Sequence, residues 1–289
     1  MSNFLVEDLK RIIKGDNPLT KVILVNVVVF LVFNLLEPLF SFKSWFGLPG
    51  DLSELIWKPY TLVTYMFLHA GLFHLFFNMI WLYFVGQIIL EYIGPKRFIS
   101  IYFLGGIAGG LFYLVAYNLF ILSGSDSIGG GLIGASAGVM AIVIAGATLV
   151  PDYRVKLVFF GTFPLKYIGV GIFILTSLLN LTENTGGKLA HVGGAIIGYT
   201  FIRMLQSGND LSQLFYSFVT PLSNLFKKKK PKMRVVKNER KAKPTPKTAA
   251  RPKAEQQRID AILDKISASG YDALTAEEKE ILFRASNKK

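Results

Sequence analysis

Apolar residues fall into runs long enough to cross a bilayer, separated by shorter polar stretches. A helix needs about 20 mainly apolar residues to span the hydrocarbon core. Six runs meet this requirement, and together they predict an all-α, polytopic membrane bundle. The predicted spans cover residues 22–40, 70–90, 98–122, 132–151, 165–182 and 189–206.

The charges between these spans alternate along the chain. Lys96 and Arg97 separate the second and third spans, and Arg154 follows the fourth, whereas the loop at 123–131 carries only Asp126. Since cytoplasmic loops are enriched in Lys and Arg, we expect both termini in the cytoplasm. No small-residue cleavage site closes the first apolar run, so we expect it to be retained as a span. The expected location is a bacterial-type cytoplasmic membrane.

Composition agrees with a membrane protein and narrows the chemistry. The 289 residues are 52% hydrophobic, and mean hydropathy is +0.43. There is no cysteine, which excludes disulfides and thiolate metal sites. The His-Glu-x-x-His motif of zinc proteases is also missing. We therefore expect neither a metal nor another cofactor.

Most of the net charge of +13 lies at the C-terminal end. Residues 207–289 contain 19 Lys and Arg against 9 Asp and Glu, which leaves +10 for this segment. A basic segment beside a membrane is typical of inside anchoring and attraction to lipid headgroups. Nucleic-acid binding is the less favoured interpretation, because residues 227–258 contain no aromatic residue for stacking on bases.

Four segments follow from these patterns. We predict a cytoplasmic amphipathic segment over 1–20, a six-helix domain over 21–206, an interfacial segment with a basic disordered linker over 207–257, and a helical hairpin over 258–289. In the hairpin, Gly270 suits a helix stop. Thr275 and Glu278 have the spacing of a capping box for the second helix.

Two polar residues share one face of the second predicted span. His74 and Asn78 are four residues apart, and His69 lies just before the span. Polar side chains inside a membrane are costly and are functional candidates by default. The alternative is that they only hold helices together through hydrogen bonds.

The fourth span opens with the small-residue sequence Gly134-Ala-Ser136-Ala-Gly138. A helix starting here presents unpaired backbone N–H groups beside Ser136, which suits a developing oxyanion. His191 lies near the start of the sixth span, and Gly194 follows it on the same face. A glycine face lets membrane helices approach closely. Packing of the two helices would bring Ser136 and His191 within reach as nucleophile and base.

The sequence Gly134-x-Ser136-x-Gly138 also matches the nucleophile elbow of α/β-hydrolases. That elbow requires a preceding strand in a soluble sheet, whereas apolar spans surround this motif. Asp152 and Glu183 are poorly placed to be the acid of a triad, so the sequence favours a Ser–His dyad.

These motifs resemble those of the rhomboid family of intramembrane serine proteases. The resemblance covers roughly residues 20–206 and rests on three motifs, each in its own span and in the right order. They are His69…His74-x-x-x-Asn78, Gly134-Ala135-Ser136 and Ala190-His191-Val192-Gly193-Gly194-x-x-x-Gly198.

The resemblance implies a role for each matched residue. Ser136 is the nucleophile and His191 the general base. His74 and Asn78, with the Ser136 backbone N–H, stabilise the oxyanion. His69 and Gly134 shape the site.

Two positions depart from the family pattern. Ala137 replaces a common glycine, a small change in size. Met140 replaces an aromatic residue that often stacks on the base. A thioether can pack on an imidazole, and we expect Met140 to shape the site with a looser hold on His191.

The implied activity is hydrolysis of peptide bonds in or near transmembrane segments of other membrane proteins, in a cavity that opens to the outer side. Lipids and transmembrane substrates are the expected partners, and the sequence leaves the oligomeric state open. Two alternatives remain. An inactive relative would bind membrane clients without cutting them. A small transporter would require paired charges or inverted repeats, and we find neither.

Overall fold

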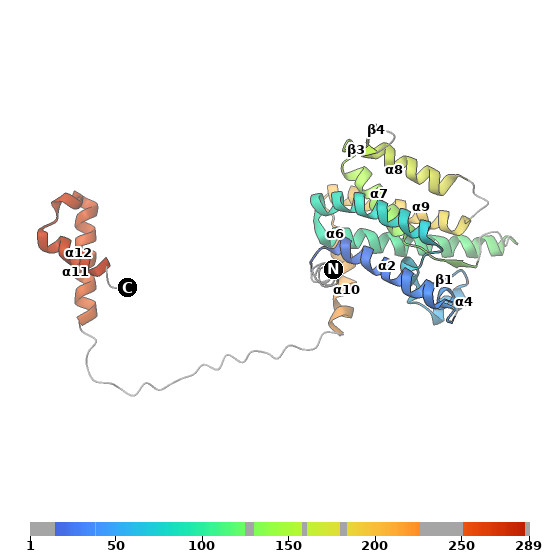
Figure 1. Cartoon of the computed structure of the whole chain (residues 1–289), viewed down its shortest axis with the longest axis horizontal. Coiled ribbons are helices and arrows are strands. Elements are labelled where there is room, and N and C mark those ends of the chain that lie inside the picture. The colour runs from blue at the N-terminus through green and yellow to red at the C-terminus, as the bar shows by residue number, and fades with distance from the viewer. Residues whose placement is uncertain are drawn as a thin grey trace, which may run out of the picture. The chain divides into compact units, whose positions relative to one another are not determined.

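The computed structural model describes residues 15–37, 39–124, 130–157, 161–179, 184–225 and 251–286 (Figure 1). The chain divides into two compact units, Met1–Lys228 and Lys229–Lys289. Most of the expected N-terminal amphipathic segment, Asp126, Glu183 and residues 226–250 of the segment expected over 207–257 lie outside the described residues.

Helices dominate the first unit, and each predicted span coincides with a helical segment. The segments are α2 (Pro18–Leu36), two halves of α6 (Leu72–Leu122), α7 (Ser136–Leu149), α8 (Leu165–Phe173) continued by the π-helical segment η2 (Ile174–Leu178), and α9 (Thr185–Gln206). Among the described helices, α2 and α6 are long and apolar enough to cross a membrane, and α7 and α8 with η2 are shorter apolar helices.

A backbone break divides α6 into two helices. Gly94 has φ +80° and ψ 174°, and Pro95 follows it inside the element. A positive φ is accessible to glycine without steric cost, and proline lacks the N–H that would continue the helix. The short turn predicted between the second and third spans therefore lies here. Beside it, Arg97 Nε donates to Asp210 Oδ2 at 2.9 Å, which ties the turn to the residues after α9.

Two details differ from the sequence prediction. The last span begins at Thr185 rather than 189, because Asn184 adopts a left-handed conformation and its side chain caps the N–H of Gly187. The expectation of helices alone omitted two antiparallel ladders of two strands each. The first pairs β1 (Leu48–Pro49) with β2 (Gly131–Leu132), and the second pairs β3 (Arg154–Leu157) with β4 (Gly161–Pro164).

The connection between α2 and α6 is folded rather than extended. It contains α3 (Phe42–Phe46), β1, α4 (Leu52–Trp57), α5 (Thr61–Thr64) and the 3-10 turn η1 (Tyr65–Phe67). Trp45 and Trp57 are 61% and 84% exposed. Exposed tryptophans are typical of residues at a membrane interface. The buried end, η1, leads directly into the start of α6.

The centre of the first unit is the contact between α6, α7 and α9 (Figure 1). Glycines line this contact, so the backbones touch. A Cβ added at Gly193 would lie 2.8 Å from the Ala108 carbonyl oxygen, and one at Gly109 would lie 2.6 Å from the Ala190 carbonyl oxygen. Such close packing is typical of small-residue faces in membrane helices. The same close packing holds α7 against α9, where a Cβ added at Gly194 or Gly198 would overlap the carbonyl oxygen of Ala137 or Ala141.

After α9, helix α10 (Leu211–Leu225) packs on α6, where Phe215 stacks on Phe103 with ring centroids 6.2 Å apart. Its residues Leu214 and Phe218 are 57% and 72% exposed. Helix α10 thus has an apolar exposed side, as expected for an interfacial segment.

The second unit consists of α11 (Arg251–Ser269), the turn η3 (Tyr271–Ala273) and α12 (Ala276–Ser286). Helix α11 starts seven residues before the expected boundary at 258. The predicted capping box is confirmed: the Thr275 N–H donates to Glu278 Oε2 at 2.8 Å, and the Glu278 N–H donates to Thr275 Oγ1 at 3.4 Å. Lys265 Nζ also donates to Glu278, and this pair links the two helices.

Candidate active site

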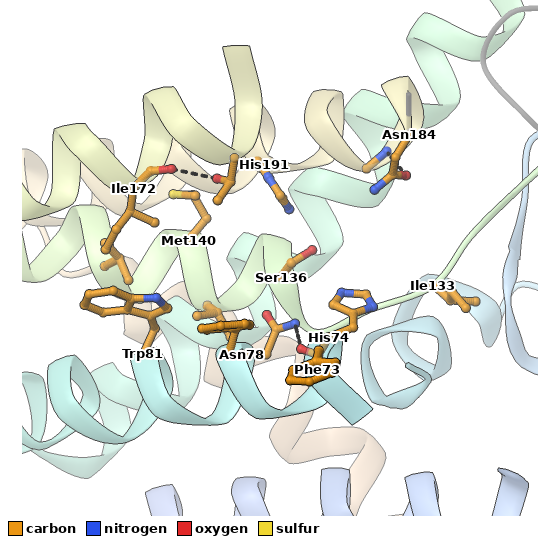
Figure 2. A pocket seen from close by; sticks show the side chains of 15 residues that line it. Phe73, His74, Asn78, Trp81, Ile133, Ser136, Met140, Ile172, Asn184 and His191 are labelled. Carbon is orange, nitrogen blue, oxygen red and sulfur yellow. Dashed lines mark hydrogen bonds between the residues drawn. The ribbon is translucent and has the colours of Figure 1, made fainter. Parts of the chain in front are cut away.

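A cavity of about 400 Å3 lies between α6, α7, η2 and α9 (Figure 2). Four of the residues singled out in the sequence line it through polar groups, namely Ser136, His191, His74 and Asn78. The remaining wall is mainly apolar and includes Phe73, Phe77, Trp81, Ile133, Met140, Val143 and Ile172. A mostly apolar cavity with a few converging polar groups is the usual form of a binding or active site.

Ser136 is the first residue of α7. The first backbone bond of the helix is donated by Val139 to the Ala135 carbonyl, at 3.0 Å. The N–H groups of the residues before Val139 therefore have no partner within the helix, and the positive end of the helix dipole lies at Ser136. Figure 2 shows the Ser136 hydroxyl pointing into the cavity, toward the rings of His191 and His74.

Gly134 brings His74 close to the serine. Its φ of +133° favours glycine, and its N–H donates to the Tyr65 carbonyl at 2.9 Å. A Cβ added at Gly134 would lie 3.0 Å from His74 Nε2 and 3.6 Å from Ser136 Oγ. Any larger residue would therefore push the imidazole away from the hydroxyl, so glycine keeps the two groups next to each other.

His74 presents Nε2 to the site. The Ala70 N–H donates to His74 Nδ1 across a long 3.5 Å contact. In a neutral imidazole, an accepting Nδ1 leaves the proton on Nε2, which then is a donor on the cavity side. His69 does not line the cavity. It is 2% exposed and lies edge-to-face on His74, with ring centroids 5.1 Å apart, so it supports the site behind that ring.

Asn78 lies one turn further along α6 and is 7% exposed. Its Nδ2 donates to the His74 carbonyl at 2.8 Å. An amide nitrogen carries two hydrogens, so a second hydrogen is left for a group in the cavity. Met140, one turn after Ser136, also lines the cavity. Packing of its thioether on His191 stays a prediction.

The side chain of His191 contacts η2 on the side of its ring nitrogen Nδ1. Its Nδ1 lies 3.3 Å from Ser177 Oγ, within hydrogen-bond distance. The sequence analysis did not identify Thr176 and Ser177 as site residues. The sequence does mark them, since they are two adjacent polar residues inside the apolar run 165–182. The fold thus brings the site residues of α6, α7, η2 and α9 together around one cavity.

The arrangement offers a hydroxyl nucleophile, an imidazole beside it and several N–H donors around one point, as acyl transfer requires. Within the described ranges, no group of three His, Cys, Asp or Glu side chains is placed to hold a metal ion.

Parts of the chain are similar in sequence to known proteins. The chain is 30% identical over 181 residues to the Arabidopsis thaliana RHOMBOID-like protein 12, mitochondrial, and the match covers 58% of this chain and 49% of that protein. The chain is 25% identical over 192 residues to the mouse presenilin-associated rhomboid-like protein, mitochondrial, and the match covers 65% of this chain and 48% of that protein. The chain is 41% identical over 86 residues to the Arabidopsis Inactive RHOMBOID-like protein 8, and the match covers 30% of this chain and 24% of that protein. The chain thus spans about half the length, or less, of these relatives.

Two family models match separate parts of the chain. A family of unknown function (DUF6576) matches residues 247–288, which include α11 and α12. The Rhomboid domain matches residues 56–207, more than half of the chain and all of the cavity described above. The chain therefore belongs to the rhomboid family.

Proposed function

We propose that this protein is an intramembrane serine endopeptidase that cuts other membrane proteins in or near their transmembrane segments. The observation that carries the proposal is the convergence of Ser136, His191, His74 and Asn78 on one cavity between packed helices. A rhomboid without activity would have no need to keep both the nucleophile and the base.

The proposed reaction is acyl transfer in two halves. The Ser136 Oγ attacks the peptide carbonyl carbon while its proton passes to His191 Nε2. That proton then goes to the leaving amine as the C–N bond breaks. Water attacks the acyl-enzyme and gives a proton to the same nitrogen, which passes it to Ser136 Oγ as the acyl C–O bond breaks, so that the acid and the free serine are released. At each tetrahedral stage, the His74 Nε2–H, the Asn78 amide and the Ser136 N–H are the proposed donors to the oxyanion.

We propose that the six helical segments cross the membrane as six spans with both termini in the cytoplasm. The positive-inside charges support this orientation. Ser136 starts its span from the side of the Ser- and Gly-rich loop, so the cavity would open to the outer side, where water enters. The proposed location is a bacterial-type cytoplasmic membrane. The proposed partners are transmembrane substrates and lipids.

An inactive rhomboid that binds membrane clients is the second candidate, since one relative is named an inactive RHOMBOID-like protein. Labelling with a serine-reactive fluorophosphonate in detergent separates the two. We expect labelling of the wild type and its loss in Ser136→Ala, together with loss of cleavage of a model transmembrane substrate. A folded wild type that neither labels nor cleaves would favour the client-binding candidate.

A further inference from the structure

A short π-helical segment contacts His191, the proposed general base. Residues Ile174–Leu178 continue α8 in π-helical form and pack against α9. Single-turn π segments inside helices occur frequently at functional sites. Ser177, in this segment, is 2% exposed, and its Oγ lies 3.3 Å from His191 Nδ1.

Two neighbouring contacts show how the hydroxyl of Ser177 can be used. Thr176 Oγ1 donates to the Ile172 carbonyl at 2.8 Å, because a carbonyl only accepts. Thr176 Oγ1 is therefore left as the acceptor in its 3.5 Å contact with Ser177 Oγ. The Ser177 hydroxyl can then donate to Thr176 Oγ1 and offer a lone pair to His191 Nδ1, which lies 3.3 Å away.

An accepting Ser177 Oγ requires a proton on His191 Nδ1. In the opposite arrangement Ser177 would donate to Nδ1 and the ring proton would lie on Nε2, which then has no lone pair for the Ser136 proton. A neutral imidazole with its proton on Nδ1 has a free lone pair on Nε2. That is the form in which a histidine can take a proton from a serine.

Other means of orienting this histidine are weak here. Met140 occupies the position from which an aromatic ring would stack on the base. In the described part of the chain, the side-chain charges that act on His191 come from His74 and Lys188, and neither is a carboxylate. A buried hydroxyl is therefore the group best placed to hold the ring.

We propose that Ser177 is a positioning residue, which fixes the tautomer and the orientation of His191 so that Nε2 faces Ser136. This inference rests on the proposed function for its kinetic consequence, whereas the tautomer itself does not depend on activity.

The kinetic test compares Ser177→Ala with Ser177→Thr, which keeps the hydroxyl. We expect Ser177→Ala to lower kcat by about 10- to 100-fold, the loss seen when the partner that orients a metal-ligating histidine is removed. KM should stay within about twofold, because Ser177 makes no substrate contact in this mechanism. Ser177→Thr should recover most of the rate.

Ser100→Ala is the matched control. Ser100 is a fully buried serine of α6 whose Oγ donates to the Lys96 carbonyl at 2.9 Å, away from the cavity. Its loss should leave kcat unchanged. A folded Ser177→Ala enzyme with the wild-type kcat, or a kcat equally low in Ser177→Thr with normal thermal stability, would overturn the proposal.

A second measurement reads the tautomer directly. In protein with 15N-labelled histidine rings, the nitrogen shifts of His191, assigned by comparison with His191→Gln, should report a protonated Nδ1 in the wild type and a mixture of tautomers in Ser177→Ala. A wild-type His191 protonated on Nε2 would refute the inference even if the protease assignment holds. Conversely, an inactive wild type with the expected nitrogen shifts would refute the proposed function alone.

Discussion

The Gly194 backbone of α9 lies directly against the Ala137 carbonyl of α7, so that a Cβ added at Gly194 would overlap the carbonyl oxygen. Ala137 follows Ser136, and Gly194 is three residues after His191. This backbone contact between the two helices therefore lies next to the two groups that must meet. The same relationship recurs one turn on, where a Cβ at Gly198 would overlap the Ala141 carbonyl oxygen.

Gly194→Ala should separate α7 from α9 and weaken the bundle. Overpacking typically costs about 1–3 kcal/mol, and backbone atoms on both sides leave little room for relief here. We expect a lower melting temperature in detergent together with a large loss of activity. Gly171→Ala is the matched control, because a Cβ there meets no atom within 4 Å. Equal melting temperatures for the two variants would contradict this account of the contact.

The dyad should behave as one unit. Ser136→Ala and His191→Ala should each abolish cleavage of a model transmembrane substrate, and the double variant should be no worse, because either loss alone stops proton transfer to the base. Rates measured for both single variants and the double variant test this. Substantial residual cleavage in one single variant would show that the assignment of that residue is wrong.

Asn78→Ala separates catalysis from packing. As an oxyanion donor, Asn78 should contribute about 10- to 1000-fold to kcat. Substrate binding and the melting temperature should stay close to wild type. Full kinetic parameters and a melting curve are required.

Asn34→Ala is the control for Asn78→Ala. Asn34 makes the same type of bond to its own helix, from Nδ2 to the Phe30 carbonyl at 2.9 Å, but on the exposed side of α2. If Asn78→Ala unfolds the protein, or leaves turnover untouched, its role is structural.

Removal of residues 227–289 should leave catalysis in detergent largely intact. All the lining residues of the cavity come before α10, and the two compact units divide near residue 228. The rate of the truncated protein on a model substrate is the measurement. A folded truncation without activity would mean that the tail completes the site.

The second unit should lose stability in acid because of Glu278. The Thr275 N–H, followed by the Lys265 ammonium, holds the pKa of Glu278 below its usual range. A carboxylate with a lowered pKa stabilises the fold above the unfolded value, about 4.3, and this contribution is lost as pH falls through the folded value.

A peptide of residues 247–289 should therefore melt at a lower temperature at pH 3 than at pH 6. The difference should shrink in Glu278→Gln and persist in Glu277→Gln, whose side chain is exposed. Circular dichroism at several pH values provides the test. An unchanged pH dependence in Glu278→Gln would show that other groups cause it.

The sequence alone was sufficient for what depends on local pattern. Long apolar runs predicted the helical segments, because backbone groups in lipid must be paired within each segment. The three motifs around His74, Ser136 and His191 led to the rhomboid family, which the comparisons confirm. The Thr275 and Glu278 spacing predicted a helix cap, because capping involves only residues three positions apart.

Only the tertiary structure decided how the groups of different helices meet. The early start of α9 depends on the left-handed Asn184, a single backbone conformation that hydrophobic periodicity does not encode. The contact of Ser177 with His191 joins residues 14 positions apart through a π-helical turn. Periodicity assigns a residue to a face of a regular helix, but a π turn changes which face points at the neighbour, so the partner of His191 emerges only once the helices are packed.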